Sequence, residues 1–336
     1  MPTFSPSLLT DLQALKPLPK RHYAWPLQPT FKPEILSTPD GSALFQEYAR
    51  LTGSVPLSLD YFKKETASQI LEVAAKVPKC GIGISTSPYL NMTKLPADDW
   101  GLACNQAISK LVADVSIMSS FLDSERQRLS HSLIVSCVMI DIEHWHTTTA
   151  SGFYEKQDPA SLRAKYDLVY DLVSKEFPQA SIVHYDRGGV SWSNGNPDSE
   201  FFDSDYYDLS EKGNYASCSL YSPIELYAMQ ETFRRTATKT AMPVVPYIAL
   251  GYNHIREPKP LGVPVKMDYK TPYPTANSYH LGWMLNFNST YTRKYGPFDR
   301  MPFGVFYPAP FSPESDTQGS TWADHFLAYC RGAHLA

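Results

Sequence analysis

The chain has 336 residues, enough for one large domain or two ordinary ones. Hydrophobic residues make up 43% and charged residues 19%, with a formal net charge of -4, so charge gives no basis for binding nucleic acid or an anionic membrane. No apolar segment approaches the ~20 residues of a membrane span, and residues 1–20 lack a secretory signal pattern. We expect a cytoplasmic protein, or a secreted one if a signal has been removed.

Apolar runs and helical periodicity alternate along the chain. Strands are expected at residues 21–25, 55–61, 80–85, 136–145, 180–186, 216–221, 244–250 and 303–307. Helices are expected at 42–51, 65–77, 97–130 with a break near 121–123, 160–177, 224–240 and 322–330. Eight strands separated by helices predict an α/β fold, a single (β/α)8 TIM barrel over residues 1–336, and no nucleotide-binding glycine motif favours an open sheet.

Two long polar stretches interrupt the alternation. Residues 188–214 are rich in Gly, Ser, Asn and Asp, and residues 251–301 contain a short helical pattern at 276–286. Long loops of this kind usually have a functional role, so we expect both to be insertions at the active-site face of the barrel.

The fourth expected strand ends in two acids, Asp141 and Glu143, with branched aliphatics at positions 138, 140 and 142. Successive side chains of a strand point to opposite faces, so the two carboxylates share one face and the aliphatics pack on the other. Two carboxylates on one strand face lie within about 7 Å, and their repulsion raises the pKa of one of them.

Active sites of such barrels lie at the carboxyl ends of the strands, which selects the residues that end each apolar run. These are Trp25, Asp60, Asp141, Glu143, His184, Tyr185, Asp186, Tyr221, Tyr247, Asn253 and Tyr307. Carboxylates among tyrosines suit glycoside cleavage, in which one acid protonates the leaving oxygen. The sequence therefore predicts a glycoside hydrolase with Glu143 as the general acid and Asp141 assisting it.

The Asp-x-Glu ending of this strand, followed by Trp145, resembles the fourth strand of chitinase-like hydrolases and hyaluronidases. Segments 219–223 and 243–247, joined by a helix containing Arg234 and Arg235, are similar to the sixth and seventh strands of hyaluronidases. In that family the Glu donates the proton, while the Asp and a Tyr position the substrate's 2-acetamido group, which attacks the anomeric carbon. The resemblance gives these roles to Glu143, Asp141 and Tyr221.

Other assignments stay open. Asp186 is a second candidate catalytic carboxylate, either as nucleophile or as base opposite Glu143. The pair His144 and His146 shares a strand face, but two imidazoles without a third ligand make a weak metal site, so neither a metal nor another cofactor is expected. The alternative functions are a glycan-binding barrel without catalysis and a barrel hydrolase of another class.

The chain is also rich in aromatic residues, with 22 Tyr, 16 Phe and 6 Trp, and aromatic faces support sugar rings. The expected partner is a carbohydrate substrate, and the sequence does not set the oligomeric state. Substrate-binding roles are expected for Trp25, Asp60, Tyr185, Trp192, Tyr247, Asn253, Trp283 and Tyr307.

Overall fold

Strands and helices alternate along the computed structural model, which describes residues 6–24, 36–88, 100–142, 159–185, 212–220, 244–250, 279, 282, 303–307 and 321–335. The strands are β1 (Arg21–Ala24), β2 (Ser54–Ser58), β3 (Gly81–Thr86), β4 (Ile134–Ile140), β5 (Ser181–His184), β6 (Tyr215–Leu220), β7 (Val244–Ala249) and β8 (Phe303–Tyr307). The helices are α1 (Pro6–Gln13), α2 (Pro39–Thr52), α3 (Lys64–Lys76), α4 (Trp100–Leu129), α5 (Pro159–Glu176) and α9 (Trp322–Ala333).

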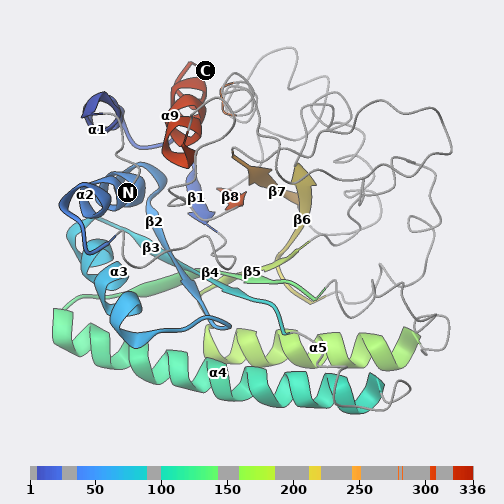
Figure 1. Cartoon of the computed structure of the whole chain (residues 1–336). Coiled ribbons are helices and arrows are strands. Elements are labelled where there is room, and N and C mark those ends of the chain that lie inside the picture. The colour runs from blue at the N-terminus through green and yellow to red at the C-terminus, as the bar shows by residue number, and fades with distance from the viewer. Residues whose placement is uncertain are drawn as a thin grey trace, which may run out of the picture.

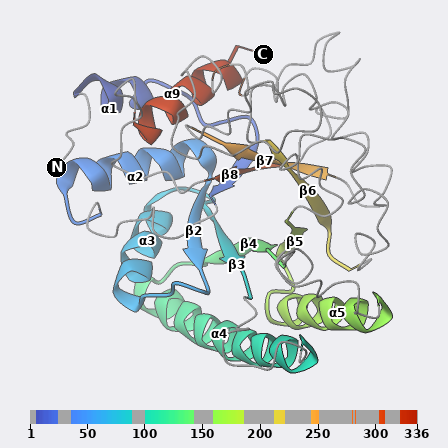
Figure 2. The same cartoon turned by 45° about the vertical axis from the view of Figure 1, so that its right-hand side comes forward.

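All strand pairs are parallel, and the sheet runs in the order β1-β8-β7-β6-β5-β4-β3-β2. The two ends of this order meet, because β1 contacts β2 and the Ser54 hydroxyl donates a hydrogen bond to the backbone oxygen of His22. Helices α2, α3, α4 and α5 lie on the outside of the ring of strands, along its left and lower sides in Figure 2. The predicted (β/α)8 barrel is confirmed.

Side chains of the strands alternate between two buried layers. The inner layer, enclosed by the sheet, contains Tyr23, Cys137, Met139, Val183, Tyr185, Val245, Tyr247, Phe303 and Val305. The outer layer lies between sheet and helices and includes Val138, Ile140 and Ile142. The aliphatic face expected for the fourth strand is therefore the outer face, and the odd-numbered positions of β4 point into the barrel.

Glycines of β3 make room for the inner layer. A Cβ on Gly83 would lie 2.6 Å from Cδ1 of Tyr23, so the tyrosine ring occupies the space that a side chain would need. At the amino end of the barrel, the Arg21 guanidinium donates hydrogen bonds to the Ser136 hydroxyl at 3.3 Å and to the Lys79 carbonyl at 2.9 Å. These contacts link the starts of β1, β3 and β4 at the end of the barrel opposite the expected active site.

A buried histidine links the first strand to the last helix. His22 lies 2.7 Å from the Lys20 carbonyl through Nδ1 and 2.7 Å from the Tyr329 hydroxyl through Nε2. Burial lowers the pKa of His22 to about 4, so the ring is neutral at physiological pH. A neutral ring that donates from Nδ1 to the carbonyl accepts the tyrosine proton at Nε2.

Local signals set the ends of the helices. The Thr38 hydroxyl accepts a hydrogen bond from the Gly41 amide at the start of α2, and Gly53 ends that helix in the left-handed region with φ 71°. Helix α9 begins with a capping box between Thr321 and Asp324.

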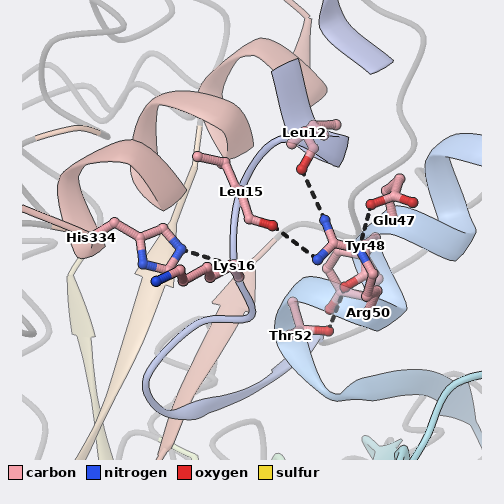
Figure 3. A network of polar contacts seen from close by, with 8 residues as sticks. All are labelled: Leu12, Leu15, Lys16, Glu47, Tyr48, Arg50, Thr52 and His334. Atoms are coloured by element: carbon pink, nitrogen blue, oxygen red, sulfur yellow. Dashed lines mark hydrogen bonds and ion pairs between the residues drawn. The ribbon is translucent and has the colours of Figure 1, made fainter. Parts of the chain in front are cut away.

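The N-terminal segment, which the sequence presents only as a Pro-rich stretch, forms helix α1 and packs on α2 and α9. Arg50 of α2 holds it by donating to the carbonyls of Leu12 and Leu15, both at 2.9 Å, while Glu47 pairs with the same guanidinium (Figure 3). His334, just after α9, contacts the Lys16 carbonyl at 2.8 Å.

Helix α4 is continuous, so the expected break near 121–123 is wrong. Phe121 and Leu122 are buried, and Asp123 forms an ion pair with Arg126 one turn later at 2.6 Å. Core packing and this pair favour an uninterrupted helix, which lies alongside α5 (Figure 1). Within the described ranges, no helix is long and apolar enough to cross a membrane.

The expected insertions are described only in part. Residues 212–214 belong to the first and lead into β6, while Tyr279 and Gly282 of the second have helical backbone. A Cβ on Gly282 would lie 2.0 Å from the Tyr329 carbonyl, which shows how closely this point of the chain approaches α9. The helix expected at 224–240 lies outside the described residues.

Candidate active site

Asp141 is the first residue after β4, and the alternation of that strand directs its side chain into the barrel. Cys137 and Met139, two and four residues earlier, belong to the inner layer, whereas Ile140 and Ile142 belong to the outer one. The Asp141 amide donates to the Thr86 carbonyl at 2.9 Å, which extends the pairing of β3 and β4 by one residue. Asp141, 7% exposed, thus lies at the carboxyl edge of the barrel.

Ser87 connects Asp141 to a second carboxylate. Its hydroxyl donates to Oδ2 of Asp141 at 3.3 Å, and its amide donates to Oδ2 of Asp60 at 2.7 Å. The Thr86 hydroxyl makes a longer contact of 3.5 Å with Oδ1 of Asp60. The three residues follow β2, β3 and β4, which are neighbours in the sheet, so the structure gathers two acids and a hydroxyl at one edge.

The electrostatics of Asp60 are unusual for an aspartate. Burial raises the pKa of Asp60 to about 7, and the negative charges of Asp114 and Asp141 add to this effect. The Ser87 amide and the Lys110 ammonium act in the opposite direction and favour the carboxylate. Asp60 therefore exchanges its proton near neutral pH. Groups with such shifted pKa values are common at sites of acid–base chemistry.

Two of the tyrosines expected to bind substrate lie in the inner layer. Tyr185 and Tyr247 meet edge to face with ring centroids 4.7 Å apart, and their exposed fractions are 9% and 2%. Their rings therefore pack inside the barrel, among the side chains of the inner layer. A contact between either ring and a sugar stays a prediction.

His184 does not point towards the barrel mouth, although it ends a strand. Its ring contacts Tyr166 and Tyr170 of α5, with centroid distances of 6.2 Å and 5.4 Å. Parity explains the difference, because Val183 and Tyr185 occupy the inward positions of this segment and His184 the outward one. This residue belongs to the packing of sheet on helix.

The other candidates are not placed. Glu143, Trp25, Asp186, Trp192, Tyr221, Asn253 and Trp283 lie outside the described residues, and Tyr307 is described only as part of β8. No group of three His, Cys, Asp or Glu residues that could hold a metal ion occurs in the described part of the chain. Sequence reasoning missed Ser87, for which the run of hydroxyl residues 85–87 after a glycine-rich strand was the available signal.

No family model and no curated protein matches the sequence. Solved structures do match it. An intracellular xylanase from Thermoanaerobacterium saccharolyticum, solved as a mutant with xylotriose, superposes with a TM-score of 0.50 at 10% identity and covers 96% of this chain and 98% of its own. A thermostable xylanase mutant from Cellvibrio japonicus gives 0.51 at 7% identity, covering 97% of this chain and 99% of its own.

Xylanase A from P fluorescens subsp. cellulosa, in complex with xylopentaose, gives a TM-score of 0.51 at 8% identity, covering 97% of this chain and 99% of its own. These proteins are TIM-barrel xylanases. At such low identity, the likeness shows the fold alone. It places the described strands and helices of this chain in the class of (β/α)8 barrels.

Proposed function

We propose that the protein is a glycoside hydrolase in which Glu143 is the general acid and Asp141 assists it. The observation that carries this proposal is the position of Asp141, which lies at the carboxyl edge of β4 with its side chain directed into the barrel. Glu143 lies outside the described residues, and the alternation of the sequence predicts that it shares the face of Asp141. In barrel enzymes this edge is where catalytic residues lie.

The chemistry requires a proton donor at the leaving oxygen and support for positive charge at the anomeric carbon. Protonated Glu143 supplies the first, and the neighbouring Asp141 carboxylate supports the second. A carbohydrate substrate agrees with the matching structures, two of which were solved in complex with xylotriose or xylopentaose.

Two routes complete the reaction. In the first, which follows the resemblance to hyaluronidases and chitinase-like hydrolases, Asp141 and Tyr221 orient a 2-acetamido group that attacks the anomeric carbon. In the second, Asp186 acts as nucleophile or as base for water. A separation of about 5.5 Å between carboxyl groups accompanies retention by a protein nucleophile, and about 6.5–9.5 Å leaves room for an inverting water.

A panel of xylan, chitin and hyaluronan oligosaccharides tests the proposal. Wild type is expected to release new reducing ends. In Glu143→Gln the rate should fall by a factor of about 10²–10⁴, the usual contribution of general acid catalysis. Asp123→Asn is the control, because that acid is exposed on α4, where it pairs with Arg126. Saturable binding without cleavage by wild type would identify a glycan-binding barrel and contradict the proposal.

The same panel separates the routes. Tyr221→Phe should lower turnover of N-acetylated substrates only if the acetamido group attacks. NMR of the first product then gives its anomeric configuration, and inversion would exclude both the acetamido route and a protein nucleophile.

A further inference from the structure

We propose that Asp60 is a positioning residue for Asp141 and acts on it through the backbone and hydroxyl of Ser87. For its effect on turnover this inference rests on the proposed function, in which Asp141 assists catalysis. It changes the expectation that Asp60 binds substrate, because the described contacts of its carboxyl group are made with the end of β3.

Residues 86–87 form hydrogen bonds with the acids on both sides of them. On the side of β2, the Asp60 carboxyl accepts from the Ser87 amide at 2.7 Å and from the Thr86 hydroxyl at 3.5 Å. On the side of β4, the Thr86 carbonyl accepts from the Asp141 amide at 2.9 Å, and the Ser87 hydroxyl donates to the Asp141 carboxylate at 3.3 Å. Thr86 and Ser87 are thus hydrogen-bonded to Asp60 on one side and to Asp141 on the other, so Asp60 can restrain the position of Asp141 through them.

The direction of the Ser87 hydroxyl depends on the backbone of this residue. The Ser87 amide donates to the Asp60 carboxyl in a short hydrogen bond of 2.7 Å, which restricts the backbone of Ser87. The hydroxyl contact to Asp141, at 3.3 Å, is long for an O–H···O bond and depends on that restraint. Removing the Asp60 carboxyl should therefore weaken the contact of Ser87 with Asp141.

The charge of Asp60 also acts on Asp141. The charged groups that act on Asp60 are Lys110 and Asp114 of α4 and Asp141 just after β4, and burial raises the pKa of Asp60 to about 7. Below that pH Asp60 is neutral and exerts no charge repulsion on Asp141. Above it, the new negative charge repels the Asp141 carboxylate from the position held by Ser87.

Four variants test the pathway through turnover. Ser87→Ala removes the hydroxyl but keeps the amide, and Asp60→Ala removes the acceptor. Each should lower kcat about tenfold, the effect of one hydrogen bond to a charged group, with KM changed less. The double variant should lose no more than the worse single variant, because both act through one segment.

Asp60→Asn is the fourth variant and supplies the rescue. Its amide oxygen can still accept from the Ser87 amide, so it should recover most of the kcat lost in Asp60→Ala. It carries no titrating group, so the decline of kcat as the pH rises through about 7 should be weaker than in wild type. Ser58→Ala is the control on β2, since within the described structure the Ser58 hydroxyl has no hydrogen-bond partner.

A titration without substrate tests the coupling independently of turnover. In protein labelled with ¹³C at aspartate carboxyls, the Asp60 signal is identified by its loss in Asp60→Asn, and its midpoint is expected near pH 7. Because the charge of Asp141 raises the pKa of Asp60, Asp141→Asn should move that midpoint down by about half a unit.

The outcomes are distinct. A lowered midpoint in Asp141→Asn together with non-additive losses of kcat supports the inference. An unmoved midpoint, additive losses, or an Asp60→Asn variant as impaired as Asp60→Ala at every pH would overturn it. If wild type cleaves no glycan, the proposed function fails, and the titration alone then decides whether Asp60 is coupled to Asp141.

Discussion

Replacing Asp60 by Asn should stabilise the folded protein at alkaline pH. The carboxyl is partly buried, and its pKa is raised from 3.8 to about 7 because burial disfavours the charged form. At pH 8 the wild-type protein must keep this charge in the fold, whereas the isosteric amide has none. The amide oxygen can still accept the hydrogen bond that the Ser87 amide donates to the wild-type carboxyl at 2.7 Å.

The direction in which stability changes with pH follows from the number of protons that the folded and unfolded states bind. Between pH 3.8 and about 7 the folded state binds more protons at this site than the unfolded state, so stability falls as the pH rises through that window. A shift of about 3 units at 1.36 kcal/mol per unit corresponds to about 4 kcal/mol as an upper bound. Partial exposure of the side chain to water reduces this to about 2 kcal/mol.

Urea unfolding of wild type and Asp60→Asn at pH 4 and pH 8 measures the effect. The free energy of unfolding of the variant minus that of wild type should be about 2 kcal/mol larger at pH 8 than at pH 4, which means that the variant gains stability relative to wild type. Because only the difference between the two proteins is used, other titrating groups cancel. Equal differences at the two pH values would show that Asp60 has an ordinary pKa and refute the reasoning.

Two further predictions concern the packing of the barrel. Because burial lowers the pKa of His22 from 6.5 to about 4, stability should fall by about 3 kcal/mol as the pH drops through that window, and urea unfolding of His22→Gln should show a flatter dependence. Gly83→Ala would put a Cβ 2.6 Å from Tyr23 and should cost about 1–3 kcal/mol in the same assay, whereas Gly101→Ala on α4, where no atom lies within 4 Å, should be neutral or stabilising.

Either prediction has a clear opposite. A His22→Gln variant with the slope of wild type between pH 4 and 6.5 would mean that the histidine is protonated in the fold. A Gly83→Ala variant as stable as Gly101→Ala would mean that the Tyr23 ring can move aside at no cost.

The fold was accessible from sequence because the barrel repeats a simple pattern. The strand expected at 303–307 is observed at the same residues, and the outward aliphatics of β4 follow from alternation alone. Helix α1 escaped prediction because it has only eight residues and lies in a proline-rich stretch. Its support comes from Arg50, 35 and 38 residues away from the carbonyls that it holds, and local patterns carry no information on such contacts.

At the candidate site, the direction of Asp141 was predictable from sequence, whereas its contacts were not. Parity and position gave the direction of Asp141, whereas the link through Ser87 to Asp60 joins residues 27 and 54 positions apart. His184 was wrongly predicted to face the barrel mouth. It has the opposite parity to Val183 and Tyr185, which point inward. Applying alternation to every strand end, not only to β4, would have removed it.

The most direct test of the proposed hydrolysis is the turnover of Glu143→Gln on the best glycan of the panel, measured at the pH optimum of wild type. With Glu143 as the general acid, kcat should fall by about 10²–10⁴ while the unfolding midpoint stays close to that of wild type. A variant that keeps more than about a tenth of the wild-type kcat would contradict the assignment, because general acid catalysis typically contributes about 10²–10⁴-fold.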